Sequence, residues 1–283
     1  MRSLNPTIIM AAGKGSRMKA ASAVPAHILL EAQSRPKAMI RIGRHALPLL
    51  EHLLLQLRVE GSQEACVVIA EGDTITEVYF EENPVPEMAV SFVRQSTPKT
   101  RNKPLGTAHA VQLALEANPH WTGQSIAIAN GDNLPPRGMF QALFAHHAAL
   151  PAFDPRHLGL PSERVLAFAV LQANERGDLT GITEKPTLEQ VENARWKDGQ
   201  PRVSMNYFRL PYQQLLSAVC AVSEHPVRKE RELPEAISLF IQSGGEMTAL
   251  SMAGAFLDLT HPSDIENAAK TLDAGGHDLH NRT

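Results

Sequence analysis

Short apolar segments alternate with longer amphipathic ones along the first half of the chain, and this alternation limits the fold more than any other feature of the sequence. Four segments rich in Val, Ile and Ala have the length of buried strands: residues 6–12, 64–72, 88–95 and 125–132. Between them, apolar residues recur every three or four positions, as in helices that pack on a sheet: residues 48–61, 73–84 and 106–119. This order predicts an α/β fold with a doubly wound, mostly parallel mixed sheet, because parallel neighbouring strands need a crossover helix.

The second half of the chain has a more mixed pattern. Four segments have strand-like composition: residues 164–172, 179–186, 202–210 and 247–254. Three segments have helical spacing: residues 211–222, 232–245 and 261–272. No repeat, linker or low-complexity block divides the chain, so we expect one domain over residues 1–283. Its two parts would meet near residue 135, and the Gly-rich tail at 273–283 would be frayed.

The composition excludes several classes of protein. The chain of 283 residues is long enough to bury a sizeable core, and its net charge of −3 gives no electrostatic support for a nucleic-acid partner. No apolar stretch approaches the length of a membrane span. Cys66 and Cys220 lie in apolar segments, which predicts buried, reduced thiols in a cytoplasmic protein. We therefore expect a cytoplasmic protein with no nucleic-acid or membrane partner.

The first predicted strand runs directly into a glycine loop, MAAGKGSRM at residues 10–18. Gly13 and Gly15 would let backbone N–H groups approach phosphate oxygens closely, and Arg17 would add a cation. The spacing differs from that of a P-loop, and Met18 stands where a dinucleotide-binding loop needs its third glycine. A dehydrogenase is therefore disfavoured, and the loop indicates a different phosphate-binding protein.

The glycine loop and six later segments together resemble the sugar-1-phosphate nucleotidyltransferases, also called nucleotide-sugar pyrophosphorylases. Their signature is an apolar strand, Ala-Ala-Gly-x-Gly-Ser/Thr-Arg-Leu/Met, and then Pro-Lys before the next helix. The later segments stand in the family's order: RPKAMIRIG, VRQ with KPLGTAHAV, IANGDN, GDLTGITEKP, ELPEAI and FLDLTHPSDIENA. The resemblance implies a Rossmann-like nucleotidyltransferase fold, with a nucleotide-binding part at about 1–135 and a sugar-binding lobe with a closing segment at about 136–272.

The reaction that this resemblance implies is transfer of a nucleotidyl group from a nucleoside triphosphate to a sugar 1-phosphate, with release of pyrophosphate. The chain is most similar to members that use UTP or dTTP, and we expect UTP. The nucleophile is already an anion, so no general base is needed. Like charges about 4 Å apart repel by several kcal/mol at an intermediate dielectric, so cations and Mg²⁺ must dominate the site.

The resemblance assigns catalytic and metal-binding roles to four residues. Asp132 and Asp258 would bind Mg²⁺, which prefers carboxylate, phosphate oxygen and water as ligands. Arg17 would hold the departing phosphates, and Lys37 would bridge the attacking phosphate and the α-phosphate. Arg17, Lys37 and Asp132 form the expected catalytic set. Arg17 and Lys37 are farther apart in the chain than is usual in the family, and the inserted KAASAVPAHILLEAQS predicts a short helix near the site.

Two further sets of residues would bind the substrates. In the nucleotide-binding set, Gln95 would contact the edge of the base; the set is Ala12, Gly13, Gly15, Ser16, Arg17, Gln95, Gly106 and Thr107. The sugar-phosphate set is Glu184, Lys185 and Asn206. Glu184 would accept hydrogen bonds from sugar hydroxyls and Lys185 would hold the sugar phosphate. Asn206 is equally compatible with a sugar contact and with a buried, hydrogen-bonded amide.

Two alternative functions remain open at this point. One is a catalytically silent regulatory protein that binds nucleotide sugars, and the other is a nucleotidyltransferase that acts on a non-sugar phosphate acceptor. The presence of Lys37, Asp132 and Asp258 together disfavours a silent protein, because a sensor need not keep a metal pair. The identity of the sugar is open as well, and relatives are commonly dimers or tetramers, which suggests a homo-oligomer.

Overall fold

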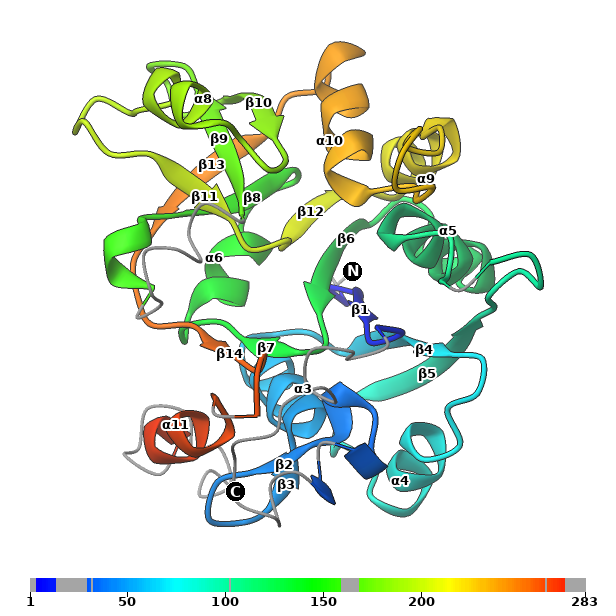
Figure 1. Ribbon diagram of the computed structural model, residues 1–283. Coiled ribbons are helices and arrows are strands. Elements are labelled where there is room, and N and C mark those ends of the chain that lie inside the picture. Colours follow the sequence, from blue (N-terminus) through cyan, green and yellow to red (C-terminus); the bar gives the residue numbers. More distant parts are fainter. Residues whose placement is uncertain are drawn as a thin grey trace.

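The computed structural model describes residues 4–13, 30–31, 33–101, 103–158, 168–262 and 264–272. Ten strands within these residues form one sheet (Figure 1). In chain order they are β1 (Thr7–Met10), β4 (Glu64–Ala70), β5 (Ala89–Gln95), β6 (Ser125–Asn130), β8 (Ala149–Phe153), β9 (Ala169–Ala173), β10 (Leu179–Thr183), β11 (Arg202–Ser204), β12 (Phe208–Pro211) and β13 (Thr248–Met252). Across the sheet the order is β10-β9-β11-β8-β12-β6-β1-β4-β5, and β13 pairs with β8 off this path.

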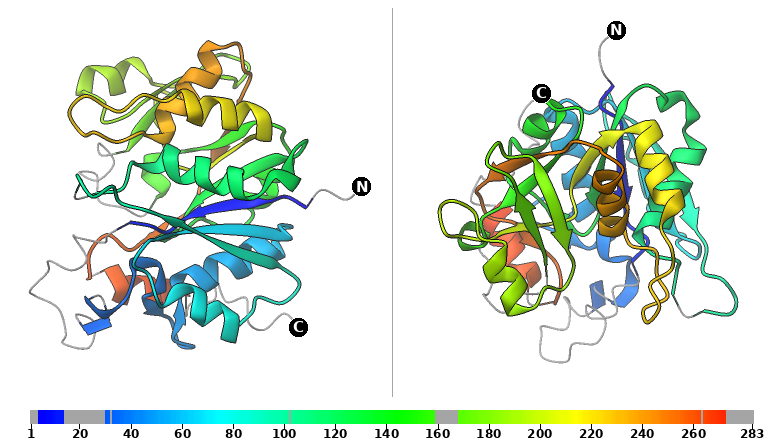
Figure 2. Two further views of the ribbon diagram at one scale, coloured as in Figure 1. Left: turned by 90° about the vertical axis from the view of Figure 1, so that its right-hand side faces the viewer. Right: turned by 90° about the horizontal axis from the view of Figure 1, so that it is seen from above.

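The part of the sheet formed by β6, β1, β4 and β5 is parallel throughout. Three helices lie between these strands in the chain: α3 (Leu49–Val59), α4 (Thr76–Glu82) and α5 (Thr107–Ala117). Figure 2 shows α3 and α4 on one face of the sheet and α5 on the other. The first half of the protein therefore has the predicted doubly wound α/β architecture.

Both faces of β1, β4 and β6 are covered, which explains why these strands are continuous apolar runs, whereas the edge strand β5 is partly exposed. Successive residues of a strand point to opposite faces. Ile9 and Val67 belong to the core that includes α3, whereas Ile8 and Val68 belong to the core that includes α5. All four side chains are fully buried. Each contributes about 1.5–3 kcal/mol to folding by leaving water.

The rest of the sheet is antiparallel, except that β13 runs parallel to β8. Helices α9 (Tyr212–Ala221) and α10 (Leu233–Gln242) share the core of α5, and α6 (Met139–Phe144) and α11 (Asp264–Thr271) share that of α3. The short helix α8 (Leu188–Asn193) begins with a capping box. Thr187 accepts from the backbone N–H of Gln190, and the Gln190 side chain accepts from that of Thr187.

The remaining elements are short. The 3₁₀ helices are Lys37–Met39, Pro119–Trp121 and Pro155–His157. Two small antiparallel sheets pair β2 (Arg41–Ile42) with β3 (Leu47–Pro48) and β7 (Asn133–Leu134) with β14 (Leu257–Asp258).

The structure differs from the sequence prediction at several points of the second half. β8, α6 and α8 were not predicted, Cys220 is exposed although it was expected to be buried, and one predicted strand is divided in two. The segment 202–210 was expected to be a single strand, but it forms β11 and β12 with a bend between them. Asn206 lies in the bend with a φ of 60°, a left-handed conformation that interrupts a strand and that asparagine tolerates better than most residues. Its backbone N–H donates to Ser204 Oγ at 3.1 Å.

The general α/β prediction is confirmed, with a parallel part followed by a mixed one. Strands from before and after residue 135 belong to the same sheet. The division of the chain into two functional parts near that residue stays a prediction. The tail at 273–283 lies outside the described residues. Of the helices that the structure describes, none has the length and apolar character needed to cross a membrane.

Candidate active site

The carboxyl ends of β1, β5 and β6 meet at one edge of the parallel sheet, where open α/β sheets bind their ligands. Gly131 immediately follows β6 and donates its N–H to the carbonyl oxygen of Met10, at 2.9 Å. A Cβ at this position would lie 3.0 Å from Ala11 Cβ, so the two strand ends approach closely because residue 131 is glycine. Ala11 and Gly131 therefore lie side by side at this edge, and each directly precedes a predicted site residue, Ala12 or Asp132.

Asp132, Lys37 and Asp258 meet at this edge. Lys37 Nζ lies 2.7 Å from Asp132 Oδ2 and 4.0 Å from Asp258 Oδ1. The side chains of Lys37 and Asp258 are only 14% and 10% exposed, whereas that of Asp132 is 39% exposed. The structure thus brings together the two predicted metal ligands and the predicted phosphate-binding lysine, which come from three distant parts of the chain.

The small β7–β14 sheet produces this convergence. Asp258 on β14 pairs with Asn133 on β7, and Asp132 directly precedes β7. The backbone N–H of Leu259 also donates to the carbonyl oxygen of Asp132, at 3.4 Å. Thr260 Oγ1 donates to Asp258 Oδ2 at 2.7 Å and restricts the orientation of that carboxylate. The backbone pairing therefore sets the separation of the two aspartates.

A fully buried tyrosine, Tyr207, holds the residue that follows Asp132. The sequence analysis did not assign a role to this tyrosine. Tyr207 donates its hydroxyl hydrogen to Asn133 Oδ1, 2.6 Å away. Burial raises the pKa of Tyr207 well above its ordinary value, and the negative charges of Asp132 and Asp258 raise it further. The hydroxyl therefore stays protonated and remains a donor to β7. Nothing in the sequence around Tyr207 indicates that its hydroxyl binds Asn133.

The residues at this edge fit a magnesium ion. An ammonium group already lies within 4.0 Å of an oxygen from each carboxylate, so the pair attracts a cation. Among the described residues, no cluster of three or more His, Cys, Asp or Glu side chains is arranged to hold a metal. A metal at Asp132 and Asp258 would therefore complete its shell with phosphate oxygens and water, which Mg²⁺ readily accepts.

The predicted base-binding residues also lie together. Gln95, at the carboxyl end of β5, is 4% exposed. Its Nε2 donates to the carbonyl oxygen of Gly106 at 2.9 Å and lies 3.3 Å from Nδ1 of His109. Gly106 precedes α5, and Thr107 is the first residue of that helix. The sequence analysis did not assign a role to His109, although it lies two residues beyond Thr107.

The loop that contains Gly106 is attached to the segment before α10. Arg231 donates its backbone N–H to Leu105 and accepts from the N–H of Ala108. Gly106 has a φ of 105°, and a Cβ there would overlap the Arg231 carbonyl oxygen. Thr107 Oγ1 accepts from the backbone N–H of Leu233, at 2.9 Å. These contacts fix the entrance to α5 against the second half of the protein.

The predicted sugar-phosphate residues lie elsewhere on the second half, and no hydrogen bond or ion pair between described residues joins them to Lys37. Glu184 follows β10 and lines a cavity of about 510 Å³ beside the loop between α9 and α10. Burial raises the pKa of Glu184, Glu232 raises it further, and Lys185 and Arg228 oppose the shift. Lys185 has a φ of 47°, a strained conformation that is more common at functional sites.

Asn206, the third member of that set, has a structural role of its own. Its left-handed backbone makes the bend between β11 and β12. The preceding carbonyl, that of Met205, accepts a hydrogen bond from Asn130 Nδ2 at the end of β6. The bend therefore lies beside the carboxyl edge, while the contact of the Asn206 side chain with a sugar stays a prediction.

Three of the predicted nucleotide-binding residues, Gly15, Ser16 and Arg17, lie outside the described residues, as does most of the inserted segment before Lys37. Ala12 is buried and Gly13 is exposed at the end of β1. The described part of the loop thus begins at the same edge as Asp132.

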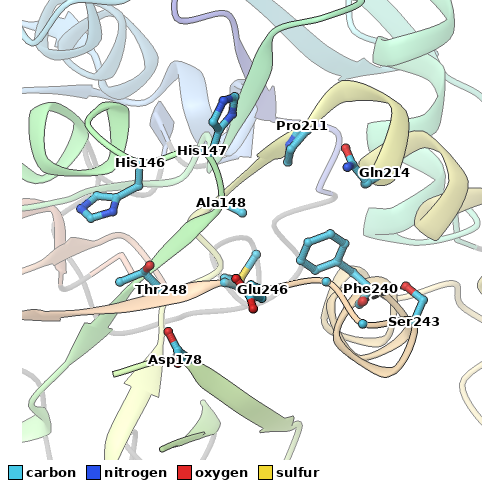
Figure 3. A pocket seen from close by; sticks show the side chains of 13 residues that line it. His146, His147, Ala148, Asp178, Pro211, Gln214, Phe240, Ser243, Glu246 and Thr248 are labelled. Carbon is cyan, nitrogen blue, oxygen red and sulfur yellow. Dashed lines mark hydrogen bonds between the residues drawn. The ribbon is translucent and has the colours of Figure 1, made fainter. Parts of the chain in front are cut away.

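A second hollow, of about 600 Å³, lies at the opposite end of β6 (Figure 3). Pro211, which lines it, pairs with Ser125 at the start of that strand. His146, Asp178 and Glu246 give it a polar lining, as the figure shows. It contains none of the predicted site residues, so the carboxyl edge is the better candidate for the active site.

Comparison with known proteins shows the family of the chain. A profile of the family described as nucleotidyl transferase matches residues 6–275. The chain belongs to the nucleotidyl transferase family. The bifunctional protein GlmU of Staphylococcus carnosus (strain TM300) is 22% identical over 239 residues, which cover 84% of this chain and 45% of that protein. GlmU of Staphylococcus epidermidis is 24% identical over 242 residues, with 84% and 46% covered. This nucleotidyl transferase chain thus spans less than half the length of these curated relatives.

Solved structures share the fold of this nucleotidyl transferase. The crystal structure of HddC from Yersinia pseudotuberculosis complexed with GMP-PN aligns with a TM-score of 0.60 at 18% identity, over 95% of this chain and 100% of that chain. A second HddC structure aligns with a TM-score of 0.61 at 19% identity, with the same coverage. The similarity confirms the predicted α/β nucleotidyltransferase fold.

Proposed function

We propose that this nucleotidyl transferase moves a uridylyl group from UTP to a sugar 1-phosphate in a Mg²⁺-dependent reaction that releases pyrophosphate. The observation that carries the proposal is the convergence of Asp132 and Asp258 on the ammonium group of Lys37. Two carboxylates and a lysine at the carboxyl edge of a parallel sheet are suited to a reaction between two polyanions.

In the proposed reaction, a phosphate oxygen of the sugar 1-phosphate attacks the α-phosphorus of UTP. A new phosphorus–oxygen bond forms as the bond to the β-phosphate oxygen breaks, and pyrophosphate leaves with the electron pair. The attacking oxygen is already ionised, so no proton has to be removed. The protein therefore has to align the two substrates in line and neutralise their negative charge.

The residues of the chain divide these tasks. Asp132 and Asp258 would hold Mg²⁺, which supplies Lewis-acid stabilisation of the phosphoryl oxygens. Lys37 lies at the same point and would add a second positive charge next to the α-phosphate. Arg17, with the backbone of Gly13 and Gly15, would hold the β- and γ-phosphates. Arg17 needs no metal for this role, because a guanidinium binds two phosphate oxygens at once.

The substrates would lie on either side of this cluster. Gln95 and the loop at Gly106 would bind the uracil, and Glu184 and Lys185 would bind the sugar and its phosphate. The related structure complexed with GMP-PN makes guanine the alternative base to test. The partly buried Glu184 is suited to accepting hydrogen bonds from sugar hydroxyls once it is ionised.

The test is pyrophosphate release by the full chain with Mg²⁺, each nucleoside triphosphate in turn, and glucose 1-phosphate, N-acetylglucosamine 1-phosphate or phosphocholine. We expect turnover with UTP and a sugar 1-phosphate. Asp258→Asn should lower kcat about 10³-fold, because a transition-state charge loses its partner. Asp178→Asn, which changes an aspartate at the second hollow, is the matched control and should keep normal turnover.

The alternatives give different results in the same assay. Turnover with phosphocholine alone would indicate a non-sugar acceptor. Binding of UDP-glucose with no pyrophosphate release from any pair of substrates would indicate a silent regulatory protein. Either result would overturn the proposed function.

A further inference from the structure

The side-chain amide of Gln95 has only one orientation that satisfies its surroundings. The carbonyl oxygen of Gly106, 2.9 Å from the amide, can accept a hydrogen bond but cannot donate one. The amide atom facing Gly106 must therefore be the nitrogen, Nε2. Among the described residues, neither of the hydrogen bonds made by the amide uses Oε1, so this oxygen is left to accept from a ligand.

His109 holds the second hydrogen of the same nitrogen. Its Nδ1 lies 3.3 Å from Gln95 Nε2, which is a donor, so Nδ1 must be the acceptor and the imidazole proton must be on the other ring nitrogen. The ring is partly buried in the first turn of α5. Burial lowers the pKa of His109, the positive charge of Arg231 lowers it further, and Glu116 opposes the shift. The neutral ring that can accept is therefore the favoured form.

We infer that His109 is a specificity-determining positioning residue: it fixes the amide of Gln95 so that Oε1 faces the base and the site selects bases with a ring N–H. This inference rests on the proposed function, in which Gln95 contacts the base. Uracil and thymine present N3–H to such an acceptor, and guanine presents N1–H. Cytosine and adenine present a lone pair at the corresponding ring nitrogen.

The discrimination has a direct physical cause. When Gln95 Oε1 faces the ring lone pair of cytosine or adenine, two desolvated acceptor atoms are left without hydrogen-bond donors. A site built to hydrogen-bond one substrate rejects analogues that lack the matching donor strongly for this reason. A rotated amide would bring Nε2 to the base and allow cytosine to bind. Rotation is opposed twice, by the carbonyl of Gly106 and by Nδ1 of His109.

The experiment compares His109→Leu with His109→Asn in the full chain. Asn places an acceptor oxygen on Cγ, where histidine has Nδ1, whereas Leu has no acceptor. We measure kcat/KM and, by calorimetry without acceptor, Kd for UTP, GTP, CTP and ATP. In the native protein, kcat/KM for UTP should exceed that for CTP more than 100-fold, because CTP would leave a polar pair mismatched. We call this quotient the UTP-to-CTP ratio. It should fall about tenfold in His109→Leu and be retained in His109→Asn.

The dependence on pH provides a second test that does not need the leucine variant to fold. Protonation of Nδ1 turns the acceptor into a donor, so the UTP-to-CTP ratio of the native protein should fall as the pH is lowered from about 8 to 5. The fall should be much smaller in His109→Asn, where only protonation of cytosine N3 at the acidic end of the range lowers the ratio. Both nucleotides carry the same triphosphate, so its titration cancels in the ratio.

The outcomes separate this inference from the proposed function. If the native protein releases pyrophosphate from none of the four nucleoside triphosphates, the proposed function fails. If it uses UTP but His109→Leu keeps the native base ratio, or if the ratio depends on pH equally in the native protein and in His109→Asn, the inference about His109 is wrong. A native preference for CTP or ATP would overturn it as well.

Discussion

Among single residues, Lys37 combines two roles that oppose each other. Its ammonium group lies 2.7 Å from Asp132 and 4.0 Å from Asp258, where it compensates their charge. A magnesium ion bound by the same carboxylates must compete with it, because both cations are attracted to the same oxygens. The same positive charge would stabilise the transition state of nucleotidyl transfer. Lys37 should therefore weaken metal binding while it accelerates the reaction.

The replacement Lys37→Met separates these roles. Without nucleotide, we expect the variant to bind Mg²⁺ about tenfold more tightly than the native protein, measured by isothermal titration calorimetry. We expect kcat to fall about 10²-fold and nucleotide Kd to change much less, since the lost interaction acts mainly in the transition state. Equal Mg²⁺ affinity in the two proteins would show that the ammonium does not occupy the metal position.

Glu184 leads to a prediction about pH. Its pKa is raised by burial and by Glu232, so its charged form is less stable in the folded protein than in the unfolded chain. The folded state therefore has its full relative stability below the unfolded pKa of about 4.5 and loses part of it as the pH rises through the folded value. Glu184→Gln should have a higher Tm than the native protein at pH 7 and the same Tm near pH 4.

The same substitution that raises the Tm should weaken binding of the sugar 1-phosphate. Glu184→Gln should raise KM for the sugar 1-phosphate about tenfold and leave KM for UTP nearly unchanged, because an amide accepts hydrogen bonds more weakly than a carboxylate. Calorimetric scans at the two pH values and initial rates check both parts. A native Tm equal to that of the variant at pH 7 would contradict the raised pKa.

The proximity of some residues could be predicted from the sequence, and that of others could not. The residue types and order of Lys37, Asp132 and Asp258 predicted their chemistry, and their convergence agrees with it. Tyr207 gave no signal, because a tyrosine in an apolar segment has the same pattern whether its hydroxyl is free or bound to Asn133. Partners that are distant in sequence are set by the tertiary fold, which local patterns do not contain.

At the scale of elements, the attachment of the Gly106 loop to the Arg231 segment links the start of α5 to the start of α10. Gly106→Ala should therefore be harmful in two ways. A side chain disfavours the φ of 105°, and its Cβ would overlap the Arg231 carbonyl. We expect a loss of about 2–3 kcal/mol in the free energy of unfolding and a rise of about tenfold or more in KM for UTP.

Gly123→Ala is the matched control for this prediction. Gly123 has a φ of 86° and open space around it, so the variant carries the backbone strain without the overlap. It should lose about 1 kcal/mol, as expected for a left-handed alanine, and keep the native KM for UTP. Urea unfolding and initial rates give both quantities. Equal effects of the two substitutions would mean that the contact with Arg231 is not required.

The element predictions succeeded where the pattern is long. β1, β4, β5 and β6 and the helices between them follow from apolar runs and helical spacing. β8 lies near the middle of the sheet but has five residues with a central proline, and β7 and β14 have two residues each. Segments this short show no recognisable alternation of apolar and polar residues. Their pairing depends on neighbouring strands whose positions are set by the tertiary fold.

For the whole molecule, the continuous sheet and two shared cores connect the two halves of the chain. Each of the two cores contains residues from both halves: Ile9 shares one core with Tyr207, and Ile8 shares the other with Ile237. Neither half can bury its apolar face without the other. The single domain predicted over residues 1–283 should therefore unfold in one cooperative transition.

Ligand binding offers a strong test of this cooperativity. UDP-glucose with Mg²⁺ contacts both halves in the proposed function, and at 100 times its Kd a ligand that binds only the folded state adds about 2.7 kcal/mol of stability. The whole transition should shift upward together in differential scanning calorimetry, with equal calorimetric and van't Hoff enthalpies. Asp258→Asn should unfold in one transition that shifts less at the same ligand concentration, because its metal site is incomplete. Two separate transitions, of which only one responds to UDP-glucose, would show that the sheet does not couple the nucleotide-binding part to the second half.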